Sequence, residues 1–178
     1  MKRRIQALLV LLLGVGWLTG CSTISVGDYA GLTPEMIPEE FFDGNLTAHG
    51  IIKNRAGKVV RYFNADINAY WDGAVGTLEE DFVFDNGKKQ RRVWTLTRQA
   101  DGSYIGTAGD VVGEAKAEIG GNSMFLKYEL MVPYGDGTIN LTIDDRMYLV
   151  APDILVNESE MRKFGFRVGE IVLVIRRI

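Results

Sequence analysis

The chain has 178 residues and carries 20 lysines and arginines against 23 aspartates and glutamates, which gives a formal net charge of −3 at neutral pH. Because Lys2, Arg3 and Arg4 lie at the very start, the remainder is more acidic still, which argues against nucleic acid or anionic lipid head groups as partners. The length suits one domain that buries its own core.

The N-terminus has the layout of a secretory signal peptide. Basic residues precede an apolar run from Ala7 to Gly16, and a junction of small residues follows. The run is interrupted by glycines and is shorter than the roughly 18 to 20 apolar residues that a membrane span needs, so we favour a signal peptide over a transmembrane helix. We expect residues 1–20 to be this signal peptide.

The end of the signal, Leu18-Thr19-Gly20-Cys21, resembles a bacterial lipobox. The resemblance implies cleavage before Cys21 and acylation of that residue, so that the chain is held at a membrane by lipid. The next residue is Ser22 and not aspartate, and by resemblance to enterobacterial lipoprotein sorting this implies an outer-membrane lipoprotein that faces the periplasm. Since Cys21 is the only cysteine, no thiol remains for a disulfide, a metal site or a nucleophile.

Residues 21–38 show no sustained period and contain two prolines, so we interpret them as a tether, and we place the folded domain at residues 39–178. From Phe41 on, apolar and polar residues alternate with period two between turn dipeptides such as Asn86-Gly87. The segment 154–163 is ambiguous between a strand and a helical turn. The other expected strands span residues 46–53, 59–71, 75–84, 91–98, 104–112, 114–119, 124–132, 138–150 and 168–176.

Eight to ten strands with short connections predict an all-β protein. An open sheet of that size would expose long edges, so we favour closure into an antiparallel up-and-down β-barrel, with a two-sheet sandwich as the alternative. A barrel of about eight strands is either filled by side chains or holds one small ligand. The final strand is apolar on both faces, as expected where a strand is covered on both sides or closes a barrel.

Five residues are candidates for binding a ligand. Asp145 shares a strand face with apolar residues, although a bulge at Asp144-Asp145 or pairing with a core arginine would also explain it. Arg92 and Trp94 share a face of another strand. Asp110 follows the small residues 106–109, where either a neighbouring strand or a ligand could approach closely. Tyr148 adds aromatic surface, although scattered aromatic residues more often belong to a core.

No pattern predicts a catalytic, cofactor or metal site. His49 is the only histidine and has no serine or cysteine motif beside it, so we interpret it as structural. The acidic run 79–81 could hold paired carboxylates, but alternation sends neighbours to opposite faces and we expect the run to be solvated. Metal-ligand spacing is lacking. An enzyme would have to use aspartate or glutamate together with tyrosine or lysine.

Several motifs along the domain resemble an uncharacterised family of proteobacterial lipoproteins with a lipocalin-like, calycin-type barrel. They are Phe41–Gly44, Asp81–Gly87 followed by Arg92–Trp94, Gly106–Ala108 with Asp110–Gly113, Asp144–Leu149, and Asn157 with Met161 and Lys163–Gly165. The chain departs from the group at Arg146, where tryptophan is usual, and at Glu158, where arginine is usual. If these two positions pair, charge has been exchanged between them.

The resemblance implies a lipocalin-like barrel, and such barrels commonly hold apolar ligands. Members of the group are often encoded near enzymes that modify membrane fatty acids, which implies a role with lipids. We therefore expect a lipoprotein that is anchored through Cys21 and binds a fatty acid or another lipid in envelope maintenance. The alternatives are a scaffolding lipoprotein that binds a protein partner through its acidic surface and, less favoured, a lipid-modifying enzyme.

Overall fold

The computed structural model describes residues 23–178, so the expected signal peptide and Cys21 lie outside the described residues. Two short helices, η1 (Val26–Tyr29) and α2 (Pro38–Phe41), precede ten strands. The strands are β1 (Gly44–Asn54), β2 (Val59–Asp72), β3 (Val75–Phe84), β4 (Lys89–Arg98), β5 (Tyr104–Thr107), β6 (Val111–Gly120), β7 (Ser123–Tyr134), β8 (Gly137–Ala151), β9 (Ile154–Lys163) and β10 (Phe166–Arg177).

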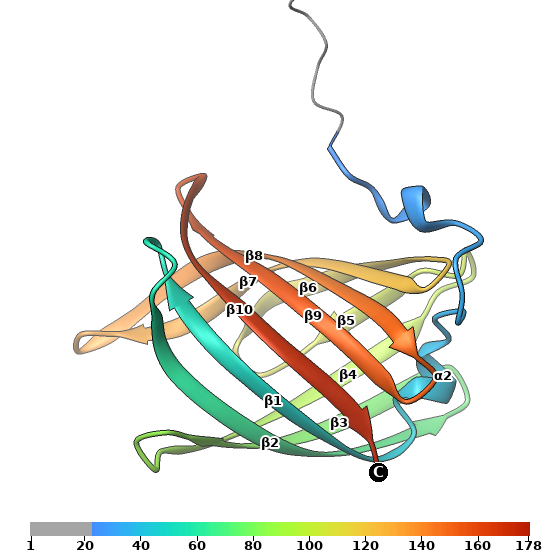
Figure 1. Ribbon diagram of the computed structural model, residues 1–178, viewed down its shortest axis with the longest axis horizontal. Helices are drawn as coiled ribbons and strands as arrows, with labels where there is room; N and C mark the ends of the chain where they lie inside the picture. Colours follow the sequence, from blue (N-terminus) through green and yellow to red (C-terminus); the bar gives the residue numbers. More distant parts are fainter. Residues whose placement is uncertain (1–22) are drawn as a thin grey trace, which may run out of the picture.

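The ten strands form one closed barrel (Figure 1). Each strand pairs antiparallel with its neighbours in the sequence, and β10 closes the ring by pairing with β1 from Leu46↔Arg177 to Asn54↔Gly169. Closure removes the exposed sheet edges that invite aggregation. The predicted all-β, antiparallel up-and-down barrel is therefore confirmed with ten strands, and the two-sheet sandwich is wrong.

Alternation along the strands separates the core from the surface. In β2, Phe63 and Ile67 are buried, whereas Asn64 and Asp66, which lie between them in the sequence, are exposed. Successive side chains of a strand point to opposite faces, so a period of two lines the barrel interior with apolar residues. The ambiguous segment 154–163 is the strand β9, with Leu155 fully buried on the inner face.

The expected strand over residues 104–112 is wrong in its extent. Strand β5 ends at Thr107, and a turn follows in which the Val111 amide donates to the Ala108 carbonyl over 3.1 Å. Strand β6 then starts at Val111, and its register with β7 shifts between Val112 and Lys116. Gly113 lies within this shift at a φ of 75°, which glycine adopts without steric cost.

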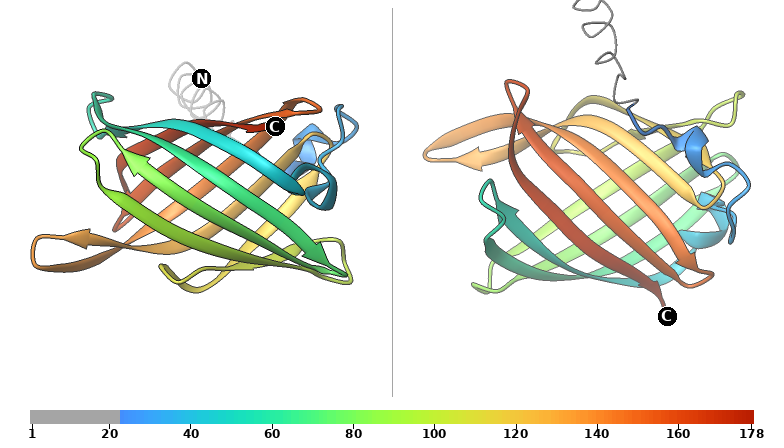
Figure 2. Two further views of the ribbon diagram at one scale, coloured as in Figure 1. Left: turned by 90° about the horizontal axis from the view of Figure 1, so that it is seen from below. Right: turned by 45° about the horizontal axis from the view of Figure 1, so that its top comes forward.

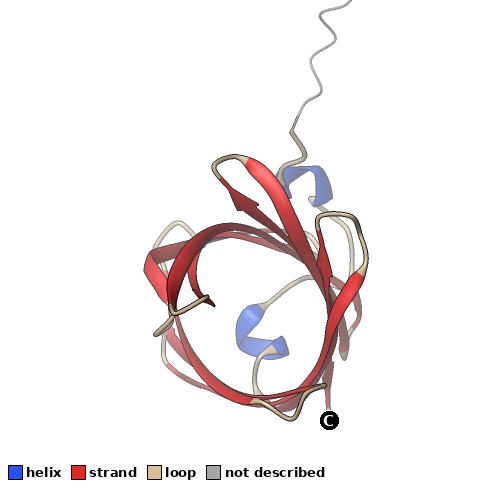
Figure 3. Ribbon diagram, turned by 90° about the vertical axis from the view of Figure 1, so that its left-hand side faces the viewer, coloured by secondary structure: helices blue, strands red, loops and turns tan. Residues whose placement is uncertain are grey.

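Helix α2 lies inside the outline of the barrel at one end (Figure 3). Phe41 and Phe42 are each only 2 % exposed, so the helix closes this end with apolar side chains. Two hydrogen bonds hold it there: Trp71 Nε1 donates to the Phe42 carbonyl at 2.8 Å, and the Tyr104 hydroxyl donates to the Glu39 carboxylate at 2.7 Å. The two donors are far from α2 in the sequence, so closure at this end depends on the finished barrel.

The segment before α2 also packs on the barrel. Figure 2 shows it in blue at the same end as α2. Tyr29 lies against Phe125 and Tyr148, with ring centroids 5.6 and 5.3 Å apart, and the Met36 amide donates to the Gly121 carbonyl at 2.8 Å. The segment expected to be a tether thus contacts the domain from Val26 on, and its role as a spacer from a membrane stays a prediction.

Helix content in the described part of the chain is small. None of the helices between residues 23 and 178 combines the length and the apolar character that crossing a bilayer requires.

Candidate functional site: a polar cluster in an apolar cavity

A cavity of about 260 Å³ lies inside the barrel. It is bounded by Phe42 beside α2 at the closed end and reaches Met131 and Pro133 near the far end of β7. This volume is slightly below the roughly 300 to 1,000 Å³ of ordinary small-molecule pockets, so it suits one slender ligand. Its apolar wall includes Ala48, Phe63, Ile67, Leu78, Leu96, Met124, Leu126, Ile171 and Leu173.

Among the described residues that line the cavity, Arg92 is the only cationic one. It lies on β4 opposite Glu80 of β3. Its Nε lies 3.0 Å from both carboxylate oxygens of Asp110, and its Nη2 donates to Asp110 Oδ2 at 2.7 Å. Its Nη1 is 3.8 Å from Glu80 Oε2, and its guanidinium lies 5.6 Å from the ring centroid of Phe82. The guanidinium is therefore held mainly by Asp110, which comes from the turn between β5 and β6.

Asp145 lies on the inner face of β8 and is 7 % exposed. Its Oδ1 accepts hydrogen bonds from Asn157 Nδ2 and from Ser159 Oγ, the latter at 2.8 Å. Both partners are on β9, and Ser159 stands directly opposite Asp145 in the strand register. The pairing with β7 and β9 is continuous through Asp144 and Asp145, so the bulge considered from the sequence is wrong. Two polar neighbours, rather than an ion pair with an arginine, accommodate this carboxyl group.

Burial controls the ionisation of this cluster. It raises the pKa of Glu80 from 4.5 to about 7, with Arg92 opposing the shift and the charges of Asp110 and Asp145 adding to it. Burial also raises the pKa of Asp145, although the hydrogen bonds from Asn157 and Ser159 act in the opposite direction. Near neutral pH, Glu80 is therefore only partly ionised, and the net charge inside the barrel depends on pH.

Two aromatic side chains lie beside the charged groups. Trp94 and Tyr128 pack edge to face with ring centroids 5.4 Å apart, and both line the cavity. Burial, followed by the charge of Asp145, raises the pKa of Tyr128 well above its usual value, so the phenol stays protonated. A Cβ atom at Gly106 would lie 3.1 Å from the Trp94 ring, so the small residue predicted to permit a close approach accommodates a core tryptophan.

The structure brings four of the five candidate residues together. Arg92, Trp94, Asp110 and Asp145 all line the cavity, and their role in binding a ligand stays a prediction. The prediction for Tyr148 is wrong in its location. Tyr148 points outward from β8 and packs on Tyr29 and Phe125, since it is an odd number of residues from Asp145 along the same strand.

Five further side chains with polar atoms line the cavity and were not among the candidates: Glu80, Gln90, Tyr128, Asn157 and Ser159. The expectation that the acidic run 79–81 is solvated is wrong for Glu80, which lines the cavity. The signal for Glu80 was the alternation itself, because Leu78 and Phe82, two residues away on either side, also line the cavity.

His49 lies on the outer face of β1, where its Nδ1 is 2.7 Å from Asn64 Oδ1 of β2. Within residues 23–178, no group of three or more histidine, cysteine, aspartate or glutamate side chains is arranged to hold a metal ion. The polar groups inside the barrel lie in a wall that is otherwise mostly apolar.

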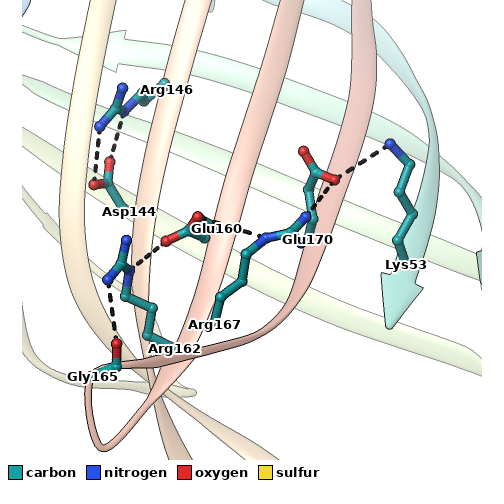
Figure 4. A network of polar contacts seen from close by, with 8 residues as sticks. All are labelled: Lys53, Asp144, Arg146, Glu160, Arg162, Gly165, Arg167 and Glu170. Atoms are coloured by element: carbon teal, nitrogen blue, oxygen red, sulfur yellow. Dashed lines mark hydrogen bonds and ion pairs between the residues drawn. The ribbon is translucent and has the colours of Figure 1, made fainter. Parts of the chain in front are cut away.

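A separate network of charges covers the outer face of β8, β9 and β10 (Figure 4). Arg167 connects Glu160 and Glu170 at 3.6 and 2.9 Å, and Glu170 also contacts Lys53 at 3.4 Å. Arg146 donates to Asp144 at 3.0 Å and stands opposite Glu158 in the register of β8 and β9. The two positions at which the chain departs from the family pattern therefore do pair across neighbouring strands.

Taken together, the fold and its interior define an antiparallel β-barrel protein with an internal apolar cavity. The chain belongs to the DUF3833 family of proteins of unknown function, whose model matches residues 15–177. No curated protein matches the chain. Among solved structures, an S-type phycobiliprotein lyase from Guillardia theta is similar, with 13 % identity, a TM-score of 0.45, and coverage of 80 % of this chain and 94 % of the lyase chain.

Proposed function

We propose that this protein is an outer-membrane lipoprotein that faces the periplasm and binds a hydrophobic ligand, a fatty acid or another lipid, inside its barrel. The observation that carries the proposal is the apolar cavity of about 260 Å³ with a polar cluster in its wall. Such a cavity buries an acyl chain, which contributes about 0.8 kcal/mol per buried methylene, and gives a head group hydrogen-bonding partners.

The test is native mass spectrometry of the chain from Ser22 on, combined with organic extraction of the purified protein. We expect a stoichiometric lipid to co-purify or to be taken up when fatty acids and lipids are added. A bare protein mass that binds none of them would contradict the proposal and direct the search to protein partners.

A matched pair of variants distinguishes binding in the cavity from binding to the surface. Ala48 lines the cavity and is 3 % exposed, so Ala48→Trp fills part of the space. His49→Trp adds an equally bulky ring at the neighbouring exposed position. We expect lipid uptake to fall in the first variant and to persist in the second, with circular dichroism confirming that both variants fold.

The membrane anchor has its own test. The proposal assigns membrane attachment to acylation of Cys21, which lies before the described residues. When cells that express Cys21→Ala are fractionated, the protein should move from the membrane fraction to the soluble fraction, or its signal peptide should remain uncleaved. Normal processing together with retention in the outer-membrane fraction would refute the anchor.

A further inference from the structure

Acidic side chains outnumber basic ones in the cavity wall. Among the residues that line the cavity, Glu80, Asp110 and Asp145 carry carboxyl groups, whereas Arg92 alone carries a positive charge. The bidentate contact with Asp110, at distances from 2.7 to 3.0 Å, already occupies two nitrogens of Arg92. The remaining nitrogen Nη1 faces Glu80 at 3.8 Å. A ligand carboxylate would therefore find no free cation and would meet two further carboxyl groups.

The interior has spare acceptors instead. Glu80 Oε2 is buried and accepts no hydrogen bond in the described part of the chain. Both side-chain hydrogen bonds to Asp145 go to its Oδ1, which leaves Oδ2 without such a donor among the described residues. The buried Glu80 Oε2 is costly without a partner, and a ligand that donates a hydrogen bond to it removes that cost.

The two acceptors line one cavity. Glu80 is on β3 and Asp145 is on β8. These strands are not adjacent in the closed ring, yet both side chains line the same cavity. Each interacts electrostatically with Arg92, and the charge of Asp145 contributes to the raised pKa of Glu80. The apolar wall on either side of them accommodates a hydrocarbon chain.

We propose that the ligand of this cavity carries a hydrogen-bond donor, an amine or a hydroxyl, that Glu80 and Asp145 accept, and that carboxylate head groups are selected against. This inference rests on the proposed binding function and narrows its ligand class from lipids in general to neutral or cationic amphiphiles. Arg92 then has a positioning role, because it holds Asp110 and balances part of the negative charge.

The experiment compares three ligands with the same chain length and different head groups: decylamine, 1-decanol and decanoate. Their affinities are measured at pH 7.5 by isothermal titration with the chain from Ser22 on, which contains all the described residues. We expect decylamine, 1-decanol or both to bind about tenfold more tightly than decanoate, since a charge-assisted or buried hydrogen bond contributes on that order.

The variant Glu80→Gln identifies the acceptor, and Glu79→Gln, one residue away on the outer face, is its matched control. If an amine is preferred, Glu80→Gln should weaken decylamine binding about tenfold and leave decanoate binding equal or stronger. If a hydroxyl is preferred, the glutamine oxygen still accepts, so 1-decanol binding should persist in this variant while Asp145→Leu reduces it. Glu79→Gln should leave all three affinities unchanged.

The possible failures are distinguishable. Decanoate binding as tightly as the other two ligands, or more tightly, would overturn the donor inference and leave the proposed lipid-binding function intact. Absence of binding by all three ligands would overturn both. The order of the affinities for decylamine, 1-decanol and decanoate is measured on the wild-type protein alone, so the inference can be refuted even if a variant does not fold.

Discussion

The inner and outer faces of the barrel wall use the same residue types with opposite physical consequences. Arg91 and Arg92 are neighbours on β4, yet the Arg91 side chain is 53 % exposed and that of Arg92 is 18 % exposed. Asp144 and Asp145 are neighbours on β8, and only Asp145 is buried. Charges on the outer face stay solvated and contribute little, whereas charges on the inner face lose hydration and depend on a few specific partners. The comparison predicts different effects of matched substitutions.

The largest difference is expected between the two arginines. Arg92→Met removes the cationic partner of Asp110 and Glu80 in the cavity wall, so the free energy of unfolding should fall by about 3 to 5 kcal/mol. Arg91→Met removes the exposed contacts with Asp81 and Glu79 and should cost less than about 1 kcal/mol. Urea unfolding of both variants measures this. Equal losses would show that burial does not separate the two faces energetically.

The next effect is a dependence of stability on pH. The pKa of Glu80 is raised from 4.5 to about 7 in the fold, so its contribution is fully favourable below pH 4.5 and is lost as pH rises toward 7. Glu80→Gln removes this titration. Relative to wild type, the variant should therefore gain about 3 kcal/mol of stability between pH 4.5 and pH 7.5. The raised pKa of Asp145 acts in the same direction in both proteins.

Urea titrations at several pH values measure this difference, and Glu79→Gln is the control. Glu79 is on the outer face of β3 and contacts the exposed Arg91. The control should keep the wild-type slope of stability against pH. A wild-type slope in Glu80→Gln as well would mean that another group carries the dependence.

A smaller effect is expected for hydroxyl groups that donate to carboxylates on either face. Ser159 Oγ donates to buried Asp145 at 2.8 Å, and Ser159→Ala should cost about 1.5 to 3 kcal/mol, the range for hydrogen bonds to charged groups. Thr142 donates to Glu129 at 2.5 Å between β8 and β7 outside the cavity wall. Thr142→Val keeps the shape and should cost less than about 1 kcal/mol. Thermal unfolding compares the two, and a larger loss in Thr142→Val would reverse the expected order.

Much of the fold follows from local signals in the sequence. Period-two alternation between turns gives the strands, and the cost of exposed edges favours closure by the apolar strand β10. The same alternation places Asp145 inside the barrel and, applied consistently, places Glu80 inside and Tyr148 outside. Those two errors came from judging Glu80 by its acidic neighbours and Tyr148 by its aromatic ring instead of by its position on the strand.

Other features depend on contacts between distant segments and leave little trace in the local pattern. Helix α2, which closes one end of the barrel, is only one short turn, so no periodic pattern in the sequence indicates it. Its position depends on hydrogen bonds from Trp71 and Tyr104. The turn at Ala108–Asp110 interrupts residues that read as one strand. Asp110 reaches Arg92 only because that turn brings it beside β4. The composition of the cavity wall was therefore predictable in part, whereas the partner of each polar group was not.

The smallest effect is expected in the outer network of Figure 4. Glu160 contacts Arg162 and Arg167 there, with the Arg167 contact at 3.6 Å. Glu160→Gln should change the unfolding free energy by less than about 1 kcal/mol at low salt, because exposed ion pairs gain little in a high dielectric. At 1 M salt, where the screening length is about 3 Å, the difference from wild type should vanish, whereas the loss in Arg92→Met should persist because buried pairs are screened much less. Measuring both variants by urea unfolding at low and high salt tests the comparison without any ligand: a salt-independent loss in Glu160→Gln, or a loss in Arg92→Met that disappears in salt, would mean that solvent reaches the two faces of the wall in a different way from that inferred from their burial.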